Sequence, residues 1–215
     1  MFELLLVTDR REAALPLPAA VEAALSAVPP GAAAVQLREK DLGGGALAEF
    51  GRALLPLCRA REAPLLVNDR IDLALALGLD GVHLAHSSVA PAEARRLLGP
   101  ARLVGVSCHS EADVREATGW ASYATFGPVF ETPSKRAFGP PLGPAALARA
   151  ARLGLPLFAL GGVGPETAEL LEAAAGVAAI RAALGGADPA GACAALYAAW
   201  SRGRARAQRP SSSGT

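Results

Sequence analysis

The sequence has few aromatic residues, few cysteines and no excess of charge of either sign. Aromatic side chains make up 5% of the 215 residues and apolar side chains 52%, so the core is expected to consist of helices packed on small branched strands. Lysine and arginine number 21, aspartate and glutamate 20, and the net charge is +1. This balance provides no global field for nucleic acid or an anionic membrane, and we expect neither partner.

The cysteines are three in number, Cys58, Cys108 and Cys193, and they lie far apart with no CxxC or Cys/His ligand spacing. This pattern is typical of reduced thiols in a cytoplasmic protein. The N-terminus opens on a strand-like apolar run without the basic region of a signal peptide. No apolar run approaches the ~20 residues that span a bilayer. We therefore expect a soluble, cytoplasmic protein.

Short apolar runs alternate with longer segments of helical period from residue 2 to residue 200. Strands are expected at 3–7, 33–37, 64–68, 81–84, 103–107, 122–126, 157–160 and 176–180. Helices are expected at 18–27, 46–60, 71–77, 90–98, 110–118, 144–152, 165–173 and 189–200. This alternation predicts an α/β fold, a single (β/α)8 TIM barrel. A doubly wound open sheet is the alternative, but it usually has fewer strands, and no GxGxxG string follows a strand here.

No interior linker divides the chain, so the barrel is expected to occupy residues 1–201. The basic, serine-rich end over 202–215 is predicted to be a disordered tail.

Polar residues follow most of the predicted strands, which is where a barrel of this kind places its chemistry. The candidate site residues are Gln36, Arg38, Lys40, Asn68, Asp69, Ser107, His109, Thr132, Ser134, Lys135, Gly162 and Arg181. Arg38 and Lys40 alternate on a strand end, so both can face the same way with Glu39 turned aside. Two cations suit a doubly charged anion, and the hydroxyls and lysine of the Thr132–Lys135 loop suit a phosphate or diphosphate. A surface ion-pair cluster over residues 38–41 is the structural alternative.

For several of these residues, a structural role is an alternative to the functional role. Asp69 could bind Mg²⁺ or cap the helix that follows. Gly162, next to Gly161, could admit a phosphate or simply form a turn. His109 could serve as an acid or base, whereas His83, flanked by apolar residues, is interpreted as an interior histidine. Cys108 has no partner base in the sequence.

Six strings together resemble the thiamine phosphate synthase/TenI family over residues 2 to about 200. They are VQLREK at 35–40, LVNDR at 66–70, GVHL at 81–84, GVSCHS at 105–110, the 127–135 run and ALGGV at 159–163. The resemblance implies a TIM barrel in thiamine biosynthesis, a transferase that joins an aminopyrimidine-methyl diphosphate to a thiazole-ethyl phosphate. Diphosphate leaves, and the thiazole nitrogen captures the pyrimidine-methyl cation.

The resemblance also implies roles for individual residues. Positions that hold diphosphate and pyrimidine are matched by Arg38, Lys40, Asn68, Thr132, Ser134 and Lys135. Asp69 matches a Mg²⁺ ligand, Ser107 a polar residue beside the pyrimidine, and Gly162 with the end of the last strand the site of the thiazole phosphate.

Two departures from the family pattern concern the metal and the thiazole phosphate. Ser88 stands where the synthases usually carry a second aspartate ligand, and a hydroxyl is a poorer ligand for Mg²⁺, so a weakened metal site is expected. Arg181 stands where a serine usually contacts phosphate. The loss of that aspartate is similar to the TenI branch, in which a histidine matching His109 acts in a thiazole tautomerase.

We predict the transferase, because Arg38, Lys40, Asp69 and Lys135 are all retained. The tautomerase and a non-catalytic ligand-binding regulator are the alternatives. The sequence leaves open whether His86 compensates for the lost carboxylate, and whether the chain forms a homo-oligomer.

Overall fold

The computed structural model describes residues 1–132 and 140–208. The strands are β1 Leu4–Val7, β2 Ala33–Leu37, β3 Leu65–Asn68, β4 Gly81–Leu84, β5 Leu103–Cys108, β6 Tyr123–Phe126, β7 Leu157–Ala159 and β8 Gly176–Ala179. The helices are α1 Leu17–Ser26, α2 Gly44–Ala60, α3 Ile71–Leu77, α4 Pro91–Leu98, α5 Glu111–Ala117, α6 Gly143–Ala151, α7 Pro165–Ala168, α8 Arg181–Leu184 and α9 Pro189–Ala207.

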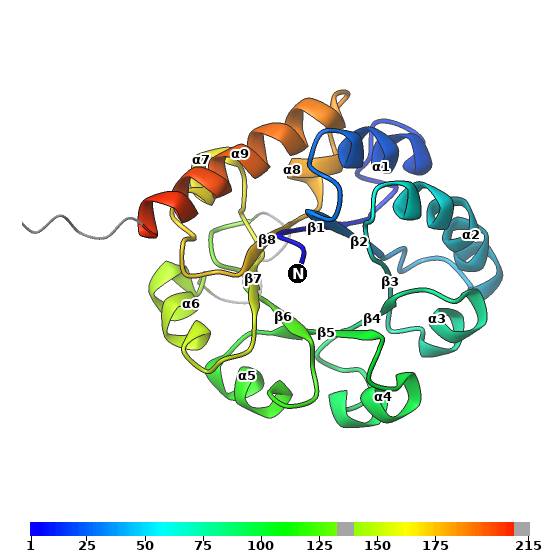
Figure 1. Ribbon diagram of the computed structural model, residues 1–215, viewed down its shortest axis with the longest axis horizontal. Helices are drawn as coiled ribbons and strands as arrows, with labels where there is room; N and C mark the ends of the chain where they lie inside the picture. The colour runs from blue at the N-terminus through cyan, green and yellow to red at the C-terminus, as the bar shows by residue number, and fades with distance from the viewer. Residues whose placement is uncertain (133–139, 209–215) are drawn as a thin grey trace, which may run out of the picture.

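The strands form one closed parallel barrel in the order of the sequence, β1 to β8. The barrel closes where β8 pairs with β1, with Leu4 opposite Val177. The helices surround the strands on the outside (Figure 1). The predicted (β/α)8 barrel is confirmed, and the pairing of the last strand with the first rules out the open sheet.

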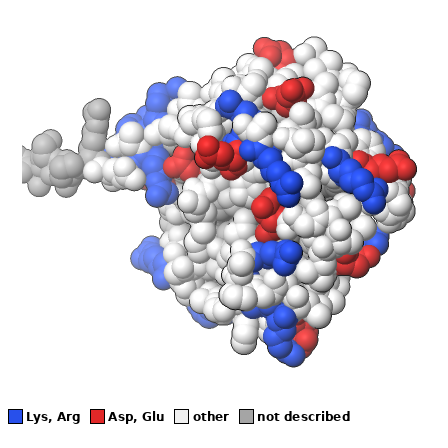
Figure 2. Space-filling model, turned by 45° about the vertical axis from the view of Figure 1, so that its right-hand side comes forward, with Lys and Arg blue, Asp and Glu red and all other residues white. Residues whose placement is uncertain are grey.

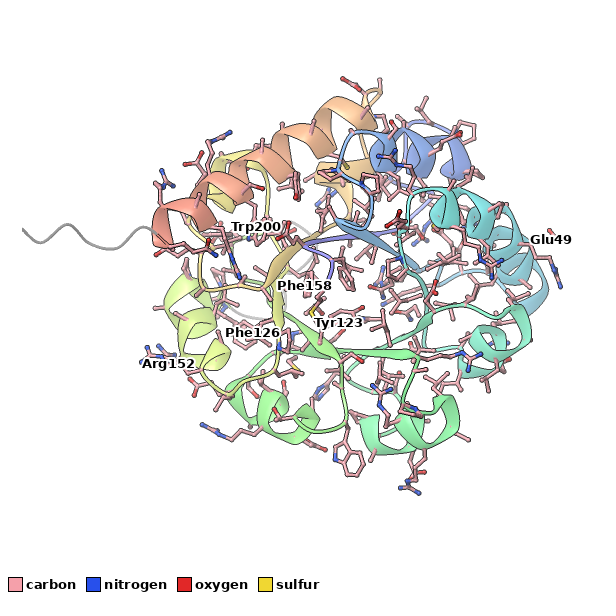
Figure 3. All side chains as sticks on the ribbon, in the orientation of Figure 1. Glu49, Tyr123, Phe126, Arg152, Phe158 and Trp200 are labelled. Carbon is pink, nitrogen blue, oxygen red and sulfur yellow. The ribbon has the colours of Figure 1, made fainter. Side chains whose placement is uncertain are left out.

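Two separate cores hold the barrel together. Inside it, Phe2 packs on Tyr123 and Phe158, with ring centroids 5.3 and 4.8 Å away. The N-terminus lies at the middle of the ring of strands, and Tyr123 and Phe158 lie within that ring (Figures 1 and 3). Residues of the opposite face, such as Leu4 and Leu6, pack outward beneath the helices. Because both faces of each strand are buried, the strands read as continuous apolar runs.

The helices begin where the sequence offers a suitable first turn. Proline occupies one of the first two positions of α1, α4, α6, α7 and α9, where its missing N–H removes no helical hydrogen bond. Ser110 caps α5, and its side chain accepts a hydrogen bond from the Asp113 N–H at 3.2 Å. These local signals account for the close match between expected and observed boundaries.

The C-terminal boundary differs from the prediction. Helix α9 runs to Ala207, so residues 202–207 belong to a helix and the expected division at 201 is wrong. Arg204 donates to the Ala174 carbonyl at 2.7 Å and lies over the Trp200 ring, while Arg202 and Arg206 both pair with Glu169. The basic run is therefore bound to the body of the protein. Residues 209–215, the rest of the predicted tail, lie outside the described residues.

The helices after β7 and β8 also differ from expectation. Helix α7 ends at Ala168 instead of residue 173, and the short helix α8 was not expected. Helix α9 packs against α1, α7 and α8, so contacts distant in sequence decide the structure of this region.

The surface carries both charges interspersed, with no large area of one sign on the face shown in Figure 2. Within residues 1–132 and 140–208, no helix is long and apolar enough to cross a membrane. All three cysteines are free and buried. Burial raises the pKa of the Cys108 thiol to about 12, so this residue is a poor nucleophile, as its sequence context indicated.

Candidate active site

The candidate residues converge because all strands of the barrel are parallel and their carboxyl ends share one mouth. The chain leaving β2 carries Gln36, Arg38 and Lys40, and the chain leaving β3 carries Asn68 and Asp69. Gln36 is buried and donates through Nε2 to Asn68 Oδ1 at 2.9 Å. Asn68 in turn donates through Nδ2 to Asp69 Oδ2 at 2.7 Å. Side chains from two neighbouring strands thus form one polar chain across the mouth.

Asp69 is held in an unusual conformation with its carboxylate exposed. Its φ of 60° lies in the left-handed region, which L-residues other than glycine adopt at a cost and which often marks functional sites. Oδ1 accepts hydrogen bonds from the Ala85 N–H at 2.8 Å and from the Ser88 hydroxyl. The side chain is thus turned toward the loop after β4 and not onto the start of α3, which has no side-chain cap. The helix-capping alternative does not apply.

Ser88 occupies the position beside Asp69 where a second carboxylate was expected from the family. It donates its hydroxyl proton to Asp69 Oδ1. Among the described residues, no group of three or more histidine, cysteine and acidic side chains could hold a metal ion by itself. A divalent cation at Asp69 would need further ligands, such as water or the oxygens of a bound ligand.

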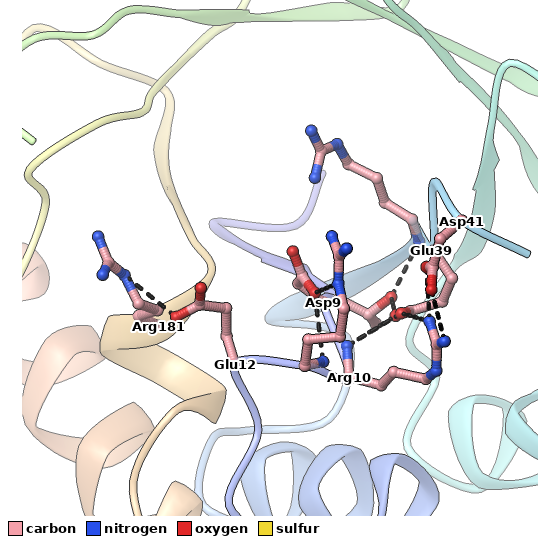
Figure 4. A network of polar contacts seen from close by, with 9 residues as sticks. Asp9, Arg10, Glu12, Glu39, Asp41 and Arg181 are labelled. Atoms are coloured by element: carbon pink, nitrogen blue, oxygen red, sulfur yellow. Dashed lines mark hydrogen bonds and ion pairs between the residues drawn. The ribbon is translucent and has the colours of Figure 1, made fainter. Parts of the chain in front are cut away.

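Arg38 lies half-buried beside these carboxylates. Partial burial lowers the pKa of its guanidinium, and the nearby carboxylates of Asp9, Glu39 and Asp69, in that order, oppose the shift. Lys40 is exposed two residues further on. Glu39 lies between Arg38 and Lys40 in the sequence, and Asp41 follows Lys40. Both carboxylates pair with Arg10 (Figure 4). The two acidic residues of this segment are thus held by the chain leaving β1.

The sequence reasoning did not assign a role to three residues that support this region, Thr8, Arg10 and Glu39. Glu39 is buried, and its carboxylate accepts a hydrogen bond from Thr8 Oγ1 at 2.6 Å. In the sequence, Glu39 is recognisable only as an acidic residue between two basic residues. Its partner Thr8, on the chain leaving β1, lies 31 positions away, so only the pairing of β1 with β2 could reveal the contact.

His83 is an interior histidine, as predicted. It is buried inside the barrel, with Nδ1 3.0 Å from the Tyr123 hydroxyl and Nε2 3.1 Å from Ser107 Oγ. Burial lowers the pKa of the imidazole to about 4, so the ring is neutral near pH 7. The ring is hydrogen-bonded to Ser107, the residue predicted to lie beside the pyrimidine, and this contact orients the Ser107 hydroxyl.

His109 lies exposed at the end of β5. Its Nδ1 is 2.5 Å from the Gly127 carbonyl oxygen, and because a carbonyl only accepts, Nδ1 carries a proton. In the neutral ring Nε2 is then the basic nitrogen. The ring of His86, from the loop after β4, lies 6.0 Å away, centroid to centroid. Within the described residues, His86 therefore lies beside His109 and forms no hydrogen bond or ion pair with Asp69 or Ser88.

The loops after β6 and β7 are joined to each other. Val129 and Phe130 donate their N–H groups to the Leu160 and Gly161 carbonyls, each at 2.9 Å. Gly162 has φ of 66°, and a Cβ there would lie 2.6 Å from the Glu131 carbonyl oxygen, so the position requires glycine for close packing. Thr132 follows this paired segment. Ser134 and Lys135, the other predicted residues of the loop, lie outside the described residues.

Arg181 begins the short helix α8 beyond β8 and is exposed. Its Nε lies 3.6 Å from Glu12 Oε2. Figure 4 shows this pair to one side of the network around Glu39. The loop after β7 and a short helix after β8 together form the usual phosphate position in this fold.

The described part of the mouth thus carries the cations Arg38 and Lys40, which suit an anionic ligand, and the polar side chains Gln36, Asn68 and Ser107. The exposed carboxylate of Asp69 lies beside Arg38.

Comparisons with known proteins agree with this geometry. The family model described as thiamine monophosphate synthase matches residues 4–183. A putative thiamine-phosphate synthase of Geobacter sulfurreducens is 47% identical over 195 residues, which cover 87% of this chain and 89% of that protein. The thiamine-phosphate synthase of Anaeromyxobacter dehalogenans is 46% identical over 189 residues, covering 86% and 85%.

Solved structures of similar proteins have the same barrel fold. The thiamine phosphate pyrophosphorylase of Pyrococcus furiosus superposes with a TM-score of 0.83 at 29% identity, covering 94% of this chain and 96% of that one. A 3-keto-L-gulonate-6-phosphate decarboxylase of Vibrio cholerae, at 15% identity and a TM-score of 0.67 over 94% and 99% of the two chains, shares the fold alone. The relatives' names agree with the predicted transferase and do not favour the isomerase or the regulator. The chain belongs to the thiamine monophosphate synthase family.

Proposed function

We propose that the protein is a transferase of thiamine biosynthesis that joins an aminopyrimidine-methyl diphosphate to a thiazole-ethyl phosphate and releases diphosphate. The observation that carries the proposal is the exposed Asp69 carboxylate, held in a left-handed conformation beside the half-buried Arg38. Together they provide one anionic and one cationic group at the place where a diphosphate and its counter-ion would meet. The names of the relatives support the same reaction.

The chain's residues would act mainly by electrostatic stabilisation of the leaving diphosphate. Arg38 and Lys40, with Thr132, Ser134 and Lys135 of the loop after β6, would bind its oxygens. Donors that are held in place before the reaction starts would stabilise the charge that develops as the carbon–oxygen bond breaks. The thiazole nitrogen attacks the methylene carbon with its own lone pair, and the step needs no proton removed from carbon.

The two rings would be held by different parts of the mouth. Gln36, Asn68 and Ser107 present amide and hydroxyl groups to the pyrimidine. Gly162 permits close backbone approach to the thiazole phosphate, and Arg181 would add a cation there. Binding both phosphates on one rigid mouth brings the nitrogen and carbon within reaction distance, which itself lowers the barrier.

Magnesium fits this site as an ion shared with the substrate. Mg²⁺ is commonly held by one or two carboxylates together with substrate phosphates and waters, and here Asp69 supplies the one carboxylate. The ion, when bound, would neutralise charge on the diphosphate. With Ser88 as the neighbour, we expect a weaker affinity for the metal than two carboxylates would give. His109 would lie on the pyrimidine side of the mouth. We place the reaction in the cytoplasm, in keeping with three free, buried cysteines.

The proposal is tested by mixing the purified protein with both substrates and measuring thiamine phosphate and released diphosphate, with and without Mg²⁺. Asp69→Asn should lower the rate at limiting Mg²⁺. Asp72→Asn, which removes an exposed carboxylate paired with Arg70 on α3, is the matched control and should leave the rate unchanged. Absence of thiamine phosphate under every metal condition would exclude the transferase. Conversion of a thiazole carboxylate phosphate by the same preparation would favour the isomerase instead.

A further inference from the structure

The carboxylate of Glu39 is enclosed and fully engaged. Its side chain is 1% exposed, although the residue lies between two of the cations proposed to hold diphosphate. Oε1 accepts from Thr8 Oγ1 at 2.6 Å and from the Arg10 N–H at 3.2 Å. Oε2 accepts from the Arg10 N–H at 2.9 Å and from Arg10 Nη1 at 3.2 Å. A buried carboxylate with this set of donors has one stable position.

Thr8 connects that carboxylate to the backbone of Arg38. Its N–H donates to the Gln36 carbonyl at 2.9 Å, which is the last backbone bond between the chains leaving β1 and β2. Its hydroxyl donates to Glu39 and accepts the Arg38 N–H at 2.9 Å. The side chain of Thr8 thus extends the strand pairing by one hydrogen bond beyond β2. The hydroxyl has one proton, and Glu39 determines where it points.

Arg10 closes the network from the outer side. Its guanidinium binds Asp41 through two hydrogen bonds of 2.7 Å. The hydrogen bond from Arg10 lowers the pKa of the Asp41 carboxyl to about 2. The chain from residue 38 to residue 41 is therefore attached at Arg38 N–H, at Glu39 and at Asp41, all to the segment after β1 (Figure 4).

We propose that Glu39 is a positioning residue for diphosphate binding, acting through Thr8 to fix the path of the chain that carries Arg38 and Lys40. Glu39 does not touch the substrate. Glu39 is buried between the half-buried Arg38 and the exposed Lys40, and the turn that carries Lys40 is closed by the Leu42 N–H on the Glu39 carbonyl at 3.2 Å. Anchoring Glu39 therefore fixes the backbone on both sides of it. This inference rests on the proposed function, since it assigns Arg38 and Lys40 to the diphosphate.

The test compares Glu39→Gln, Thr8→Val and Thr8→Ser with the unmodified protein. Affinity for inorganic diphosphate is measured by calorimetry at fixed salt, and the KM for each substrate by steady-state kinetics. Glu39→Gln and Thr8→Val should weaken diphosphate binding about 10- to 100-fold, the range of one lost charge-assisted hydrogen bond. Thr8→Ser, which keeps the hydroxyl, should stay within about threefold. The KM for the thiazole phosphate should not change.

Glu49→Gln is the matched control, because Glu49 lies exposed on α2 and points away from the barrel (Figure 3). A folded Glu39→Gln protein that binds diphosphate as tightly as the unmodified protein would overturn the inference. If Glu39→Gln does not fold, the Thr8 pair decides: equal affinities in Thr8→Val and Thr8→Ser would overturn it as well. An unmodified protein that neither binds diphosphate nor forms product would refute the proposed function itself, and this inference with it.

A second readout is insensitive to overall stability. The chain has two lysines, Lys40 and Lys135, so an amine reagent followed by mass spectrometry reports on Lys40 individually. Saturating diphosphate should slow modification of Lys40 in the unmodified protein, with the N-terminal amine as internal reference. In Glu39→Gln the protection should be largely lost even at saturation. Full protection in that variant would show that Lys40 still reaches the ligand and would contradict a positioning role.

Discussion

Lowering the pH should destabilise the protein through His83. The imidazole is enclosed in the barrel, where Tyr123, Ser107 and Thr125 are its hydrogen-bonding neighbours. Burial lowers its pKa from 6.5 to about 4. Between these two values the unfolded chain binds a proton that the folded protein does not, so the stabilisation is complete above pH 6.5 and is lost as the pH falls toward 4.

The size of the effect follows from the width of that window. A difference of about 2.5 pKa values corresponds to roughly 3 kcal/mol once the pH is below both. At pH 5 the loss of unfolding free energy should be about 2 kcal/mol. The charged ring would also have to donate from both nitrogens, which changes the hydrogen bond that Ser107 receives at the mouth.

Urea unfolding at pH 7, 6 and 5 measures this loss when the protein is compared with His83→Gln. The glutamine can still donate and accept hydrogen bonds, but it does not titrate. The variant should be less stable at pH 7 and should lose about 2 kcal/mol less than the unmodified protein on going to pH 5. Parallel stability curves for the two proteins would show that His83 does not hold its neutral form in the barrel, and the reasoning would be wrong.

Three further outcomes are expected from the site and the C-terminus. Ser88→Asp should raise synthase activity at low Mg²⁺ and its dependence on the metal; an unchanged metal requirement would mean that the second carboxylate is not what limits the site. Lys40→Arg should lower kcat/KM for the pyrimidine diphosphate about tenfold, since a planar guanidinium cannot replace a compact ammonium; equal activity would show that charge alone suffices. A chain ended after Ser201 loses the bond of Arg204 to Ala174 and should be less stable by about 1.5–3 kcal/mol in urea unfolding, whereas a chain ended after Gln208 should match the full-length protein.

The barrel was predictable because each strand is buried on both faces and each helix on one. This difference in burial produces apolar runs that alternate with segments of helical period in the sequence. The expected strand boundaries fall within one residue of the observed ones. The predicted C-terminal helix ended too early, at residue 200, because the run of arginine and glycine that follows has a composition typical of a disordered tail. Its helical state depends on Glu169 and the Ala174 carbonyl, which no local pattern reveals.

The position of the candidate residues at the barrel mouth was predictable to the extent that it follows from the strand ends. Asn68, Asp69 and Ser107 are polar residues directly after apolar runs, and the parallel barrel brings them together. The sequence could not show that Glu39 supports the site, because a carboxylate is buried only where hydrogen-bond donors surround it in the folded protein. Those donors, Thr8 and Arg10, lie on the chain leaving β1, and their contact depends on the register of β1 with β2.

Lysine is rare in this chain compared with arginine. Of the 21 basic residues, only Lys40 and Lys135 are lysines, which leaves 21 − 2 = 19 arginines. Arginine makes the planar, two-bonded contacts seen between Arg10 and Asp41, and such contacts suit a carboxylate of fixed position. An ammonium is a compact point charge with three donors, which complements the planar contact that Arg38 would make with a diphosphate. Both lysines of the chain, Lys40 and Lys135, are among the residues proposed to bind the diphosphate, and the Lys40→Arg variant tests whether the ammonium itself is needed there.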